Sequence, residues 1–373
     1  RGVRDRADPG VTSLGKDAGF RICGRRVGPR EPIYIVAEMS GNHNGDLRRA
    51  VATVEAAAAA GADAIKLQTY TADTMTIDCA DPAFIVREEG PWKGRKLYDL
   101  YREAHTPWEW HHELFKVASD SGVAIFSTPF DTTAVDFLES LDAPAYKIAS
   151  FELVDDLLLR RVARTRKPVI VSTGMASSEE IAHALATLRG EGCQEILLLK
   201  CTSSYPAPDS SLNLASLPSL APLGGVPVGL SDHTMGSTAA VAAVTLGACF
   251  VEKHFTLSRA DGGVDSHFST EPEEFRALVT DVRRAEQMLG VPAFGPGAFE
   301  EGNAAFRRSL YAVQDISQGE ELTTDNVRAI RPGDGLSPKY LDLTLGRRAT
   351  RDIRRGTPLA WELVGAIAGP REP

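Results

Sequence analysis

Short apolar runs alternate with amphipathic stretches through the first three quarters of the chain. The runs have the length and composition of buried strands, whereas the stretches between them are rich in helix formers. The eight runs cover residues 33–39, 64–69, 123–128, 145–150, 168–173, 195–201, 226–231 and 248–254. The clearest helical stretches cover residues 47–60, 108–119, 178–188, 236–245 and 273–289. Strands that alternate with helices predict βαβ units, and eight such pairs predict an α/β fold of the (β/α)8 TIM-barrel type.

The two ends of this region follow other patterns. Residues 1–19 are rich in Gly, Asp and Arg without periodicity, so we expect a flexible tail. Residues 20–28 alternate apolar and polar positions around Gly24, which predicts a hairpin suited to plug the bottom of the barrel. Residues 290–306 are rich in Gly, Pro and small residues and predict a linker. The barrel domain is therefore predicted to span residues 20–289.

The last part of the chain, residues 307–373, contains a strand-like piece at 309–313. It also contains two similar passages, DISQGE at 315–320 and DIRRGT at 352–357. This internal repeat predicts a small, β-rich second domain with pseudo-symmetric halves.

One connection in the barrel region is unusually long. Residues 70–106 exceed the usual loop between a strand and a helix, and they include several aromatic and charged residues. This composition favours a lid over a site rather than a structureless insertion.

Charge and cysteine content narrow the class of protein. A net charge of -9 over 373 residues argues against a nucleic-acid-binding surface but permits a local basic pocket for a small anion. The five cysteines are scattered without a C-x-x-C pair, which is typical of reduced thiols. No apolar stretch is long enough to span a bilayer, and the N-terminus lacks the apolar core of a secretory signal. We therefore expect a cytoplasmic protein with no nucleic-acid or membrane partner.

Polar residues end every predicted strand, and in a barrel these ends meet at the mouth where such enzymes keep their chemistry. Lys66 and Lys147 lie inside apolar strands, where unpaired lysines are rarely tolerated. With a ring of hydroxyls they suit a cage for a phosphate or carboxylate, and Schiff-base formation is the alternative role for either lysine. The other polar groups near the strand ends include Gln68, Thr128, Ser150, Ser172, Ser203, Tyr205, Ser231 and Glu252.

Two histidines and a glutamate complete this set. His233 and His254 each follow an apolar strand, so both are expected at the same mouth. Two neutral imidazoles near a carboxylate suit a divalent metal ion with open positions, although two unrelated histidines with local hydrogen bonds are the alternative. Glu38 has no neighbouring arginine in the sequence and is a candidate general acid or base. Together these groups suit the activation of an aldehyde toward an anionic enol carbon donor.

The residues around these ends resemble a known family. The matching motifs are AEMSGNHNG at 37–45, KLQTY at 66–70, FSTPF at 126–130, STGM at 172–175, GLSDHT at 229–234 and EKHF at 252–255. They are similar, in the same order, to those of the sialic acid synthase family, whose members condense phosphoenolpyruvate with acylamino sugars. The last part of the chain resembles that family's antifreeze-like (SAF) domain, with RPGDG at 331–335.

The resemblance implies a transferase that forms a carbon–carbon bond and releases phosphate. It implies catalytic roles for Glu38, Lys66 and Lys147 and a divalent ion at His233 and His254, Mn²⁺ before Mg²⁺ or Co²⁺. Substrate contacts are expected at Gln68, Thr128, Ser150, Ser172, Ser203, Tyr205, Ser231, Glu252, Asp265 and Arg331. Ser203 stands where the N-acetylneuraminate enzymes generally carry Asn, so their exact substrate contacts do not transfer. In the family the SAF domain caps the partner's barrel in a domain-swapped homodimer, which would place Arg331 in trans.

Several passages are more similar to the pseudaminic branch of the family than to the N-acetylneuraminate branch. They are TYTADTMT at 69–76, GPW at 90–92, RKLY at 95–98, TPWEWH at 106–111 and KCTSSYP at 200–206. The acceptor sugar of that branch is 2,4-diacetamido-2,4,6-trideoxy-L-altrose. The alternatives are an N-acetylneuraminate or legionaminic acid synthase, a heptulosonate-type barrel synthase, or a carbohydrate-binding protein that uses the antifreeze-like domain.

Overall fold

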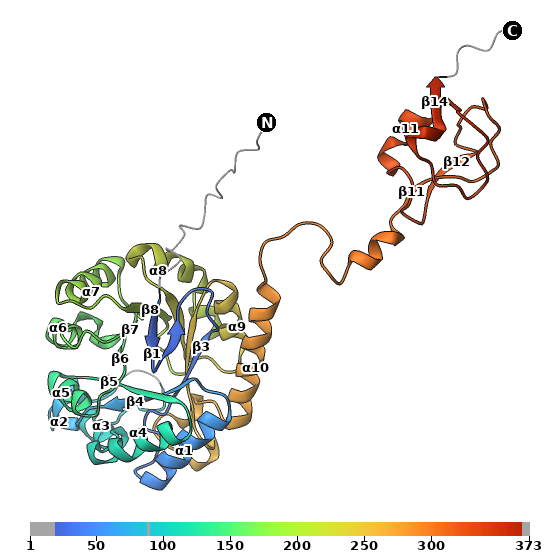
Figure 1. Cartoon of the computed structure of the whole chain (residues 1–373). Helices are drawn as coiled ribbons and strands as arrows, with labels where there is room; N and C mark the ends of the chain where they lie inside the picture. The colour runs from blue at the N-terminus through green and yellow to red at the C-terminus, as the bar shows by residue number, and fades with distance from the viewer. Residues whose placement is uncertain (1–18, 88–89, 368–373) are drawn as a thin grey trace. The chain divides into compact units, whose positions relative to one another are not determined.

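The computed structural model describes residues 19–87 and 90–367, and a closed barrel of parallel strands forms its first part (Figure 1). The strand order around the barrel is β10-β3-β4-β5-β6-β7-β8-β9. The bounds are β3 (Tyr34–Glu38), β4 (Ala64–Thr69), β5 (Ala124–Pro129), β6 (Tyr146–Ile148), β7 (Val169–Ser172), β8 (Ile196–Cys201), β9 (Val228–Asp232) and β10 (Phe250–His254). All eight predicted strands and the predicted TIM barrel are confirmed.

Helices form the outer layer of the barrel (Figure 1). They are α1 (Leu47–Ala59), α4 (His111–Asp120), α5 (Thr132–Ser140), α6 (Asp156–Ala163), α7 (Ser178–Gly190), α8 (Leu217–Gly224), α9 (Thr238–Thr245) and α10 (Pro272–Leu289). Side chains of Asp46, Asp131, Asp155 and Ser177 accept hydrogen bonds from the first free N–H groups of α1, α5, α6 and α7, which explains where these helices begin. The helix predicted over residues 108–119 begins instead with a 3-10 turn, Trp108–Trp110, before α4.

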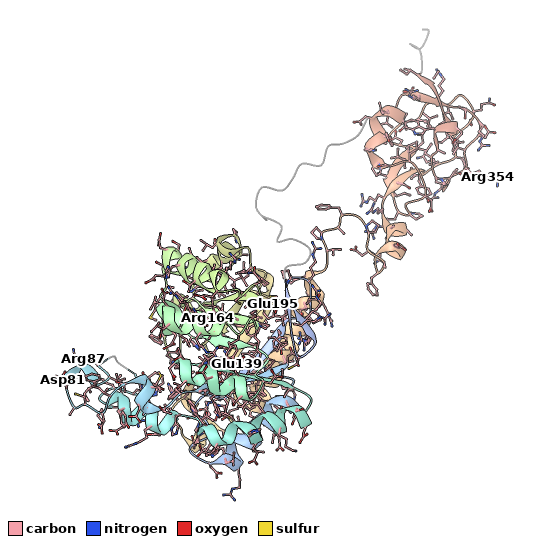
Figure 2. All side chains as sticks on the ribbon, turned by 60° about the vertical axis from the view of Figure 1, so that its left-hand side comes forward. Asp81, Arg87, Glu139, Arg164, Glu195 and Arg354 are labelled. Atoms are coloured by element: carbon pink, nitrogen blue, oxygen red, sulfur yellow. The ribbon has the colours of Figure 1, made fainter. Side chains whose placement is uncertain are left out.

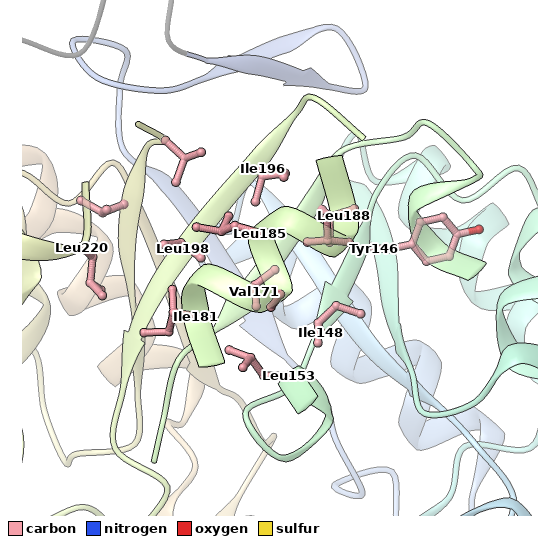
Figure 3. Close-up of a cluster of buried hydrophobic side chains, with 14 of the residues drawn as sticks. Tyr146, Ile148, Leu153, Val171, Ile181, Leu185, Leu188, Ile196, Leu198 and Leu220 are labelled. Atoms are coloured by element: carbon pink, nitrogen blue, oxygen red, sulfur yellow. The ribbon is translucent and has the colours of Figure 1, made fainter. Parts of the chain in front are cut away.

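The main core lies between the strands and this helical layer (Figure 3). Outward-facing strand residues such as Ile148 and Val171 pack against helix residues such as Leu185 and Leu188, and all four are buried. Many charged groups lie at the surface instead: Arg164, which Figure 2 labels, pairs with Glu191, Nε to Oε2 2.9 Å. The apolar runs of the sequence are thus apolar because both faces of each strand are covered.

An apolar plug fills the lower half of the barrel interior. The N-terminal hairpin of β1 (Phe20–Ile22) and β2 (Arg25–Val27) packs Phe20, Ile22 and Val27 against inward-facing residues that include Tyr34 and Phe250. The predicted plug is confirmed. At Gly229, also inside the barrel, a Cβ would lie 2.5 Å from the Phe250 carbonyl oxygen, so a larger residue does not fit.

The carboxylate of Asp63 ties the hairpin and the last barrel helix to the bottom of the strands. It accepts a hydrogen bond from the Ile35 N–H (2.8 Å) and pairs with Arg25 and with Arg283 Nη2 (3.0 Å). These partners come from β2, β3 and α10, so one mostly covered carboxylate links three segments that are far apart in the sequence.

The long connection after β4 forms several short elements in its described part. It contains α2 (Ala72–Met75), a 3-10 turn at Pro82–Phe84 and α3 (Leu97–Ala104), and a bridge pairs Ile85 with Lys96. A small apolar cluster of Leu100, Ala104 and Val264 attaches it to the loop after β10.

The chain divides into two compact units between Gly290 and Val291. The second unit contains β11 (Ser309–Ala312), β12 (Val327–Ile330), α11 (Leu341–Thr344), β13 (Arg347–Ala349) and β14 (Val364–Ile367), with β11 antiparallel to β12 and β13 to β14. In the described part of the chain, no helix combines the length and hydropathy needed to cross a membrane.

The predicted internal repeat is confirmed by reciprocal contacts. Ile316 and Ile353 exchange backbone hydrogen bonds of 2.8 Å in both directions. The Asp315 carboxylate accepts from the Arg355 N–H (2.8 Å), and the Asp352 carboxylate accepts from the Gln318 N–H (2.7 Å). Each aspartate therefore binds the residue three positions after the other, which is a local pseudo-twofold arrangement.

Replacement of Asp63 should destabilise the barrel. Asp63→Ala leaves two arginines and one backbone N–H near the bottom of the strands without their anion, and a loss of about 3 kcal/mol in unfolding free energy is expected. Urea denaturation measures this loss. Asp136→Ala, which removes the exposed pair with Arg161 (2.7 Å), is the control and should cost less than about 1 kcal/mol. Equal losses in the two variants would contradict the role of Asp63.

Candidate active site

Alternation along the strands places apolar residues low in the barrel and charged residues at its mouth. On β3, Tyr34 and Val36 belong to the interior core, and the next inward residue is Glu38. On β10, Phe250 belongs to that core and is followed by Glu252 and His254. The same rule applies to the predicted site residues on the other strands, so the barrel gathers them at one end.

Two lysines and two glutamates form a buried network there. Lys66 Nζ lies 2.6 Å from Glu38 Oε2, 3.0 Å from Thr128 Oγ1 and 3.8 Å from Glu252 Oε1. Lys147 Nζ lies 3.0 Å from the same Glu252 oxygen, and the side chains of all four charged residues are at most 5% exposed. The sequence suggested lysines free to hold an anion and a glutamate without a cation. The structure pairs them, because neighbouring strands bring together residues far apart in the sequence.

The two carboxyls of the network have different pKa values. Burial raises the pKa of Glu38 to about 7, with Lys66 opposing the shift and Glu252 adding to it. Burial also acts on Glu252, but Lys147 and Lys66 outweigh it and hold its pKa below the usual value. Glu252 is therefore the fixed anion of the pair, and Glu38 is the group able to exchange a proton near neutral pH.

Serine hydroxyls line the cavity beside the lysines. Ser231 Oγ donates to Glu252 Oε1 (3.2 Å), and Ser150 Oγ accepts from the Gly174 N–H (3.1 Å). A Cβ on Gly174 would collide with the hydroxyls of both Ser150 and Ser203, so these serines converge. Within the described residues, the buried hydroxyls of Ser172 and Ser203 have no hydrogen-bond partner, which leaves them available to a ligand.

His233 and His254 lie together at the mouth, as their strand ends predict. Their ring centroids are 5.4 Å apart. The His233 Nδ1 lies 2.8 Å from the Thr202 carbonyl oxygen, to which it donates, so its Nε2 carries the free lone pair. The buried His254 Nδ1 has no hydrogen-bond partner among the described residues, and burial holds the pKa of this ring well below its usual value.

These two imidazoles fit a divalent ion by their donor type and by the unpartnered nitrogen of His254. Over residues 19–87 and 90–367, no group of three or more His, Cys, Asp or Glu side chains is placed to hold a metal. An ion bound at this pair would therefore complete its coordination with water or substrate oxygens.

Aromatic rings wall this side of the cavity. The ring centroid of Tyr205 lies 4.4 Å from that of His233, and the ring centroid of Phe268 lies 4.7 Å from that of His254. Trp92, from the connection predicted to be a lid, lies 5.6 Å from Tyr205, and its indole N–H donates to the Val264 carbonyl (2.9 Å). The connection therefore reaches the cavity mouth. Phe268 was not predicted as a site residue, because a lone aromatic residue in a loop has no sequence pattern that indicates a binding site.

Gln68 and Asp265 lie next to Glu38 on the remaining side. Gln68 Nε2 donates to Glu38 Oε1 (2.8 Å) and to Ser40 Oγ (3.2 Å). The Ser40 hydroxyl also donates to the Asp265 carboxylate, whose pKa is raised by burial. Every predicted site residue except Arg331 thus lies in the barrel unit. Arg331 is exposed in the second unit, where it directly follows β12 as the first residue of the RPGDG passage.

The fold and these groups define a barrel enzyme whose cavity combines lysines, a titratable glutamate and paired imidazoles. The NeuB family model matches residues 53–293, and the SAF domain model matches residues 307–365. The chain belongs to the NeuB family.

Named relatives refine this assignment. The pseudaminic acid synthase of Campylobacter jejuni subsp. jejuni serotype O:2 is 44% identical over 327 residues, which are 88% of this chain and 95% of that protein. The pseudaminic acid synthase of Helicobacter pylori is 42% identical over 332 residues, 88% of this chain and 97% of that protein. A solved structure of N-acetylneuraminic acid (sialic acid) synthetase from Leptospira borgpetersenii, in complex with citrate, matches with a TM-score of 0.69 and 30% identity, covering 76% of this chain and 94% of that chain.

Glu38→Gln should remove a pH dependence of stability. Because the pKa of Glu38 is raised from 4.5 to about 7 in the folded protein, ionisation of this carboxyl disfavours folding as the pH rises through that window. Between these two pH values, the unfolding free energy of the wild type should therefore fall relative to that of the variant. Above them, the difference between the two proteins should stay constant. Urea denaturation across this range, with exposed Glu55→Gln as the control, measures the difference. A constant difference would contradict the raised pKa.

Proposed function

We propose that this NeuB-family enzyme is a pseudaminic acid synthase. It condenses phosphoenolpyruvate with 2,4-diacetamido-2,4,6-trideoxy-L-altrose to give pseudaminic acid and phosphate. The observation that carries the proposal is the 44% identity to a pseudaminic acid synthase over 88% of this chain and 95% of that protein. The cavity supports it, because a carbon–carbon bond between an anionic enol donor and an aldehyde needs an anion site, a proton carrier and an electrophile activator.

Phosphoenolpyruvate is assigned to the lysine side of the cavity. Lys66 and Lys147 supply the cationic groups, and the unpartnered hydroxyls of Ser172 and Ser203 supply donors for phosphate or carboxylate oxygens. Thr128 and Ser231 contact the same network through Lys66 and Glu252. Ser150 lies beside them and accepts from the Gly174 N–H. Schiff-base chemistry is a weaker role for the lysines, because both are bound to carboxylates.

The sugar is assigned to the opposite side, against the histidines and the aromatic wall. A divalent ion held by His233 and His254, Mn²⁺ before Mg²⁺ or Co²⁺, would polarise the aldehyde of the open-chain sugar. Tyr205 orders this side by packing on the His233 ring. Asp265 presents a carboxylate there, suited to a sugar hydroxyl or amide N–H.

Glu38 lies between the two sides and is assigned the proton transfers. Its raised pKa keeps a proton available near neutral pH, so it can protonate the alkoxide that forms from the aldehyde oxygen and so give the new hydroxyl. Gln68 orients it through the 2.8 Å hydrogen bond to Oε1. When carbon 3 of phosphoenolpyruvate has attacked the aldehyde, water adds at carbon 2 and phosphate leaves.

We assign the second unit to the other subunit's active site. Residues 307–373 would form a SAF domain joined by residues 290–306 to a synthase domain of residues 20–289, and Arg331 would contact an acyl group of the sugar in a domain-swapped, cytoplasmic homodimer. Residues 1–19 lie almost wholly outside the described residues, so their assignment as a flexible tail remains a prediction.

Mixing two inactive chains tests the contact in trans. Glu38→Ala and Arg331→Ala chains, each inactive alone, should recover about a quarter of wild-type activity when co-expressed. When the two chains pair at random, half of the dimers contain one chain of each kind, and one of the two sites in each such dimer is intact. Phosphate release from the mixture measures the recovery, and doubly tagged heterodimers isolated from it should reach about half of wild-type activity because each has one of its two sites intact. No recovery in folded heterodimers would contradict the swapped arrangement.

A substrate panel tests the proposed function. The diacetamido trideoxy altrose should be preferred over N-acetylmannosamine by about 100-fold in kcat/KM, because a site built for two acetamido groups leaves polar groups unpaired with a sugar that has one. It should also be preferred over the legionaminic acid precursor, which presents its two acetamido groups with a different stereochemistry. Phosphate release and product mass are measured, with Glu38→Ala as the blank. Preference for N-acetylmannosamine would contradict the assignment to the pseudaminic branch.

A further inference from the structure

A second buried ion pair lies directly behind the two histidines. Lys253 Nζ is 2.7 Å from Asp232 Oδ2, and the two side chains are 2% and 0% exposed. Lys253 and Asp232 are register partners on the neighbouring strands β10 and β9. Each is followed immediately by one of the histidines, so the pair spans the outer face of the same two strand ends that carry the imidazoles on the inner face.

The same two side chains also fix the loop after β9. Asp232 Oδ1 accepts from the Thr234 N–H (2.9 Å) and from the Thr234 hydroxyl (2.8 Å). Lys253 Nζ donates to the Thr234 carbonyl oxygen (2.6 Å). His233 is therefore held on both sides along the chain, by Asp232 before it and by Thr234 after it.

Stability alone does not account for a charged pair in this position. A buried ion pair is often no more stabilising than apolar side chains of similar volume. The outward positions one alternation earlier on the same strands are occupied by Leu230 and Val251, both buried and apolar. Apolar side chains at positions 232 and 253 would therefore pack equally well. The charged pair adds directional contacts, which fix the relative positions of the two strand ends.

We propose that Lys253, Asp232 and Thr234 position His233 and His254 for a divalent ion. This inference rests on the proposed metal site. The ion pair sets the lateral spacing of the two strand ends, and the contacts to Thr234 set the direction in which the His233 ring leaves β9. Neither Lys253 nor Asp232 needs to touch the metal or the substrate, so both are positioning residues.

The double variant Asp232→Leu/Lys253→Met tests the role without leaving a buried charge. Binding of Mn²⁺ alone to the purified full chain is measured by calorimetry. Its affinity should fall by about 10- to 100-fold, the loss typical of removing groups that orient metal ligands. Phosphoenolpyruvate affinity, measured separately, should stay within about twofold, because the lysine side of the cavity is unaltered.

Controls separate positioning from folding. Asp63→Ala should lower the unfolding free energy but leave Mn²⁺ affinity unchanged, since Asp63 lies at the opposite end of the barrel. If the double variant does not fold, Asp232→Asn gives the answer, with a several-fold loss of Mn²⁺ affinity expected. Wild-type Mn²⁺ affinity in a folded variant that lacks the pair would overturn the inference alone. A wild-type protein that binds no divalent ion would instead overturn the metal site and the inference with it.

Discussion

The closed barrel imposes one constraint on which the rest of the site depends: every second residue of each strand faces an interior that contains little water. Low in the barrel this position must be apolar, and the hairpin completes the seal with Phe20, Ile22 and Val27. Polar side chains are tolerated only at the mouth, where they satisfy one another. The network of Glu38, Lys66, Lys147 and Glu252 is the result, because β3, β4, β6 and β10 bring these four side chains together inside the barrel.

Much of this architecture is predictable from the sequence, because its signals are local. Apolar runs separated by helix formers located all eight strands. The paired DI-x-x-G passages predicted pseudo-symmetric halves in the second unit, and the reciprocal contacts agree with that prediction. The convergence of His233 and His254 also followed, since parallel strands end on the same side.

The partners of the charged groups were not predictable in this way. Lys66 and Glu38 are register partners on the neighbouring strands β4 and β3, and they meet through this register, which no local pattern encodes. The same holds for Lys253 and Asp232. In the sequence they look like ordinary polar residues at the ends of strands, so neither their burial nor their pairing could be predicted. The position of Trp92 depends on how a long connection folds back onto the loop after β10, and this requires tertiary packing.

Charge balance in the cavity links substrate binding to proton transfer. Without a ligand, two lysines are matched by two carboxyls, one of which holds its proton near neutral pH. An entering phosphate or carboxylate would take up the positive charge of Lys66, which now lowers the pKa of Glu38, and would add negative charge beside it. Both changes favour the protonated form of Glu38. Binding of the anionic donor would therefore increase the protonated fraction of Glu38 before the aldehyde is attacked.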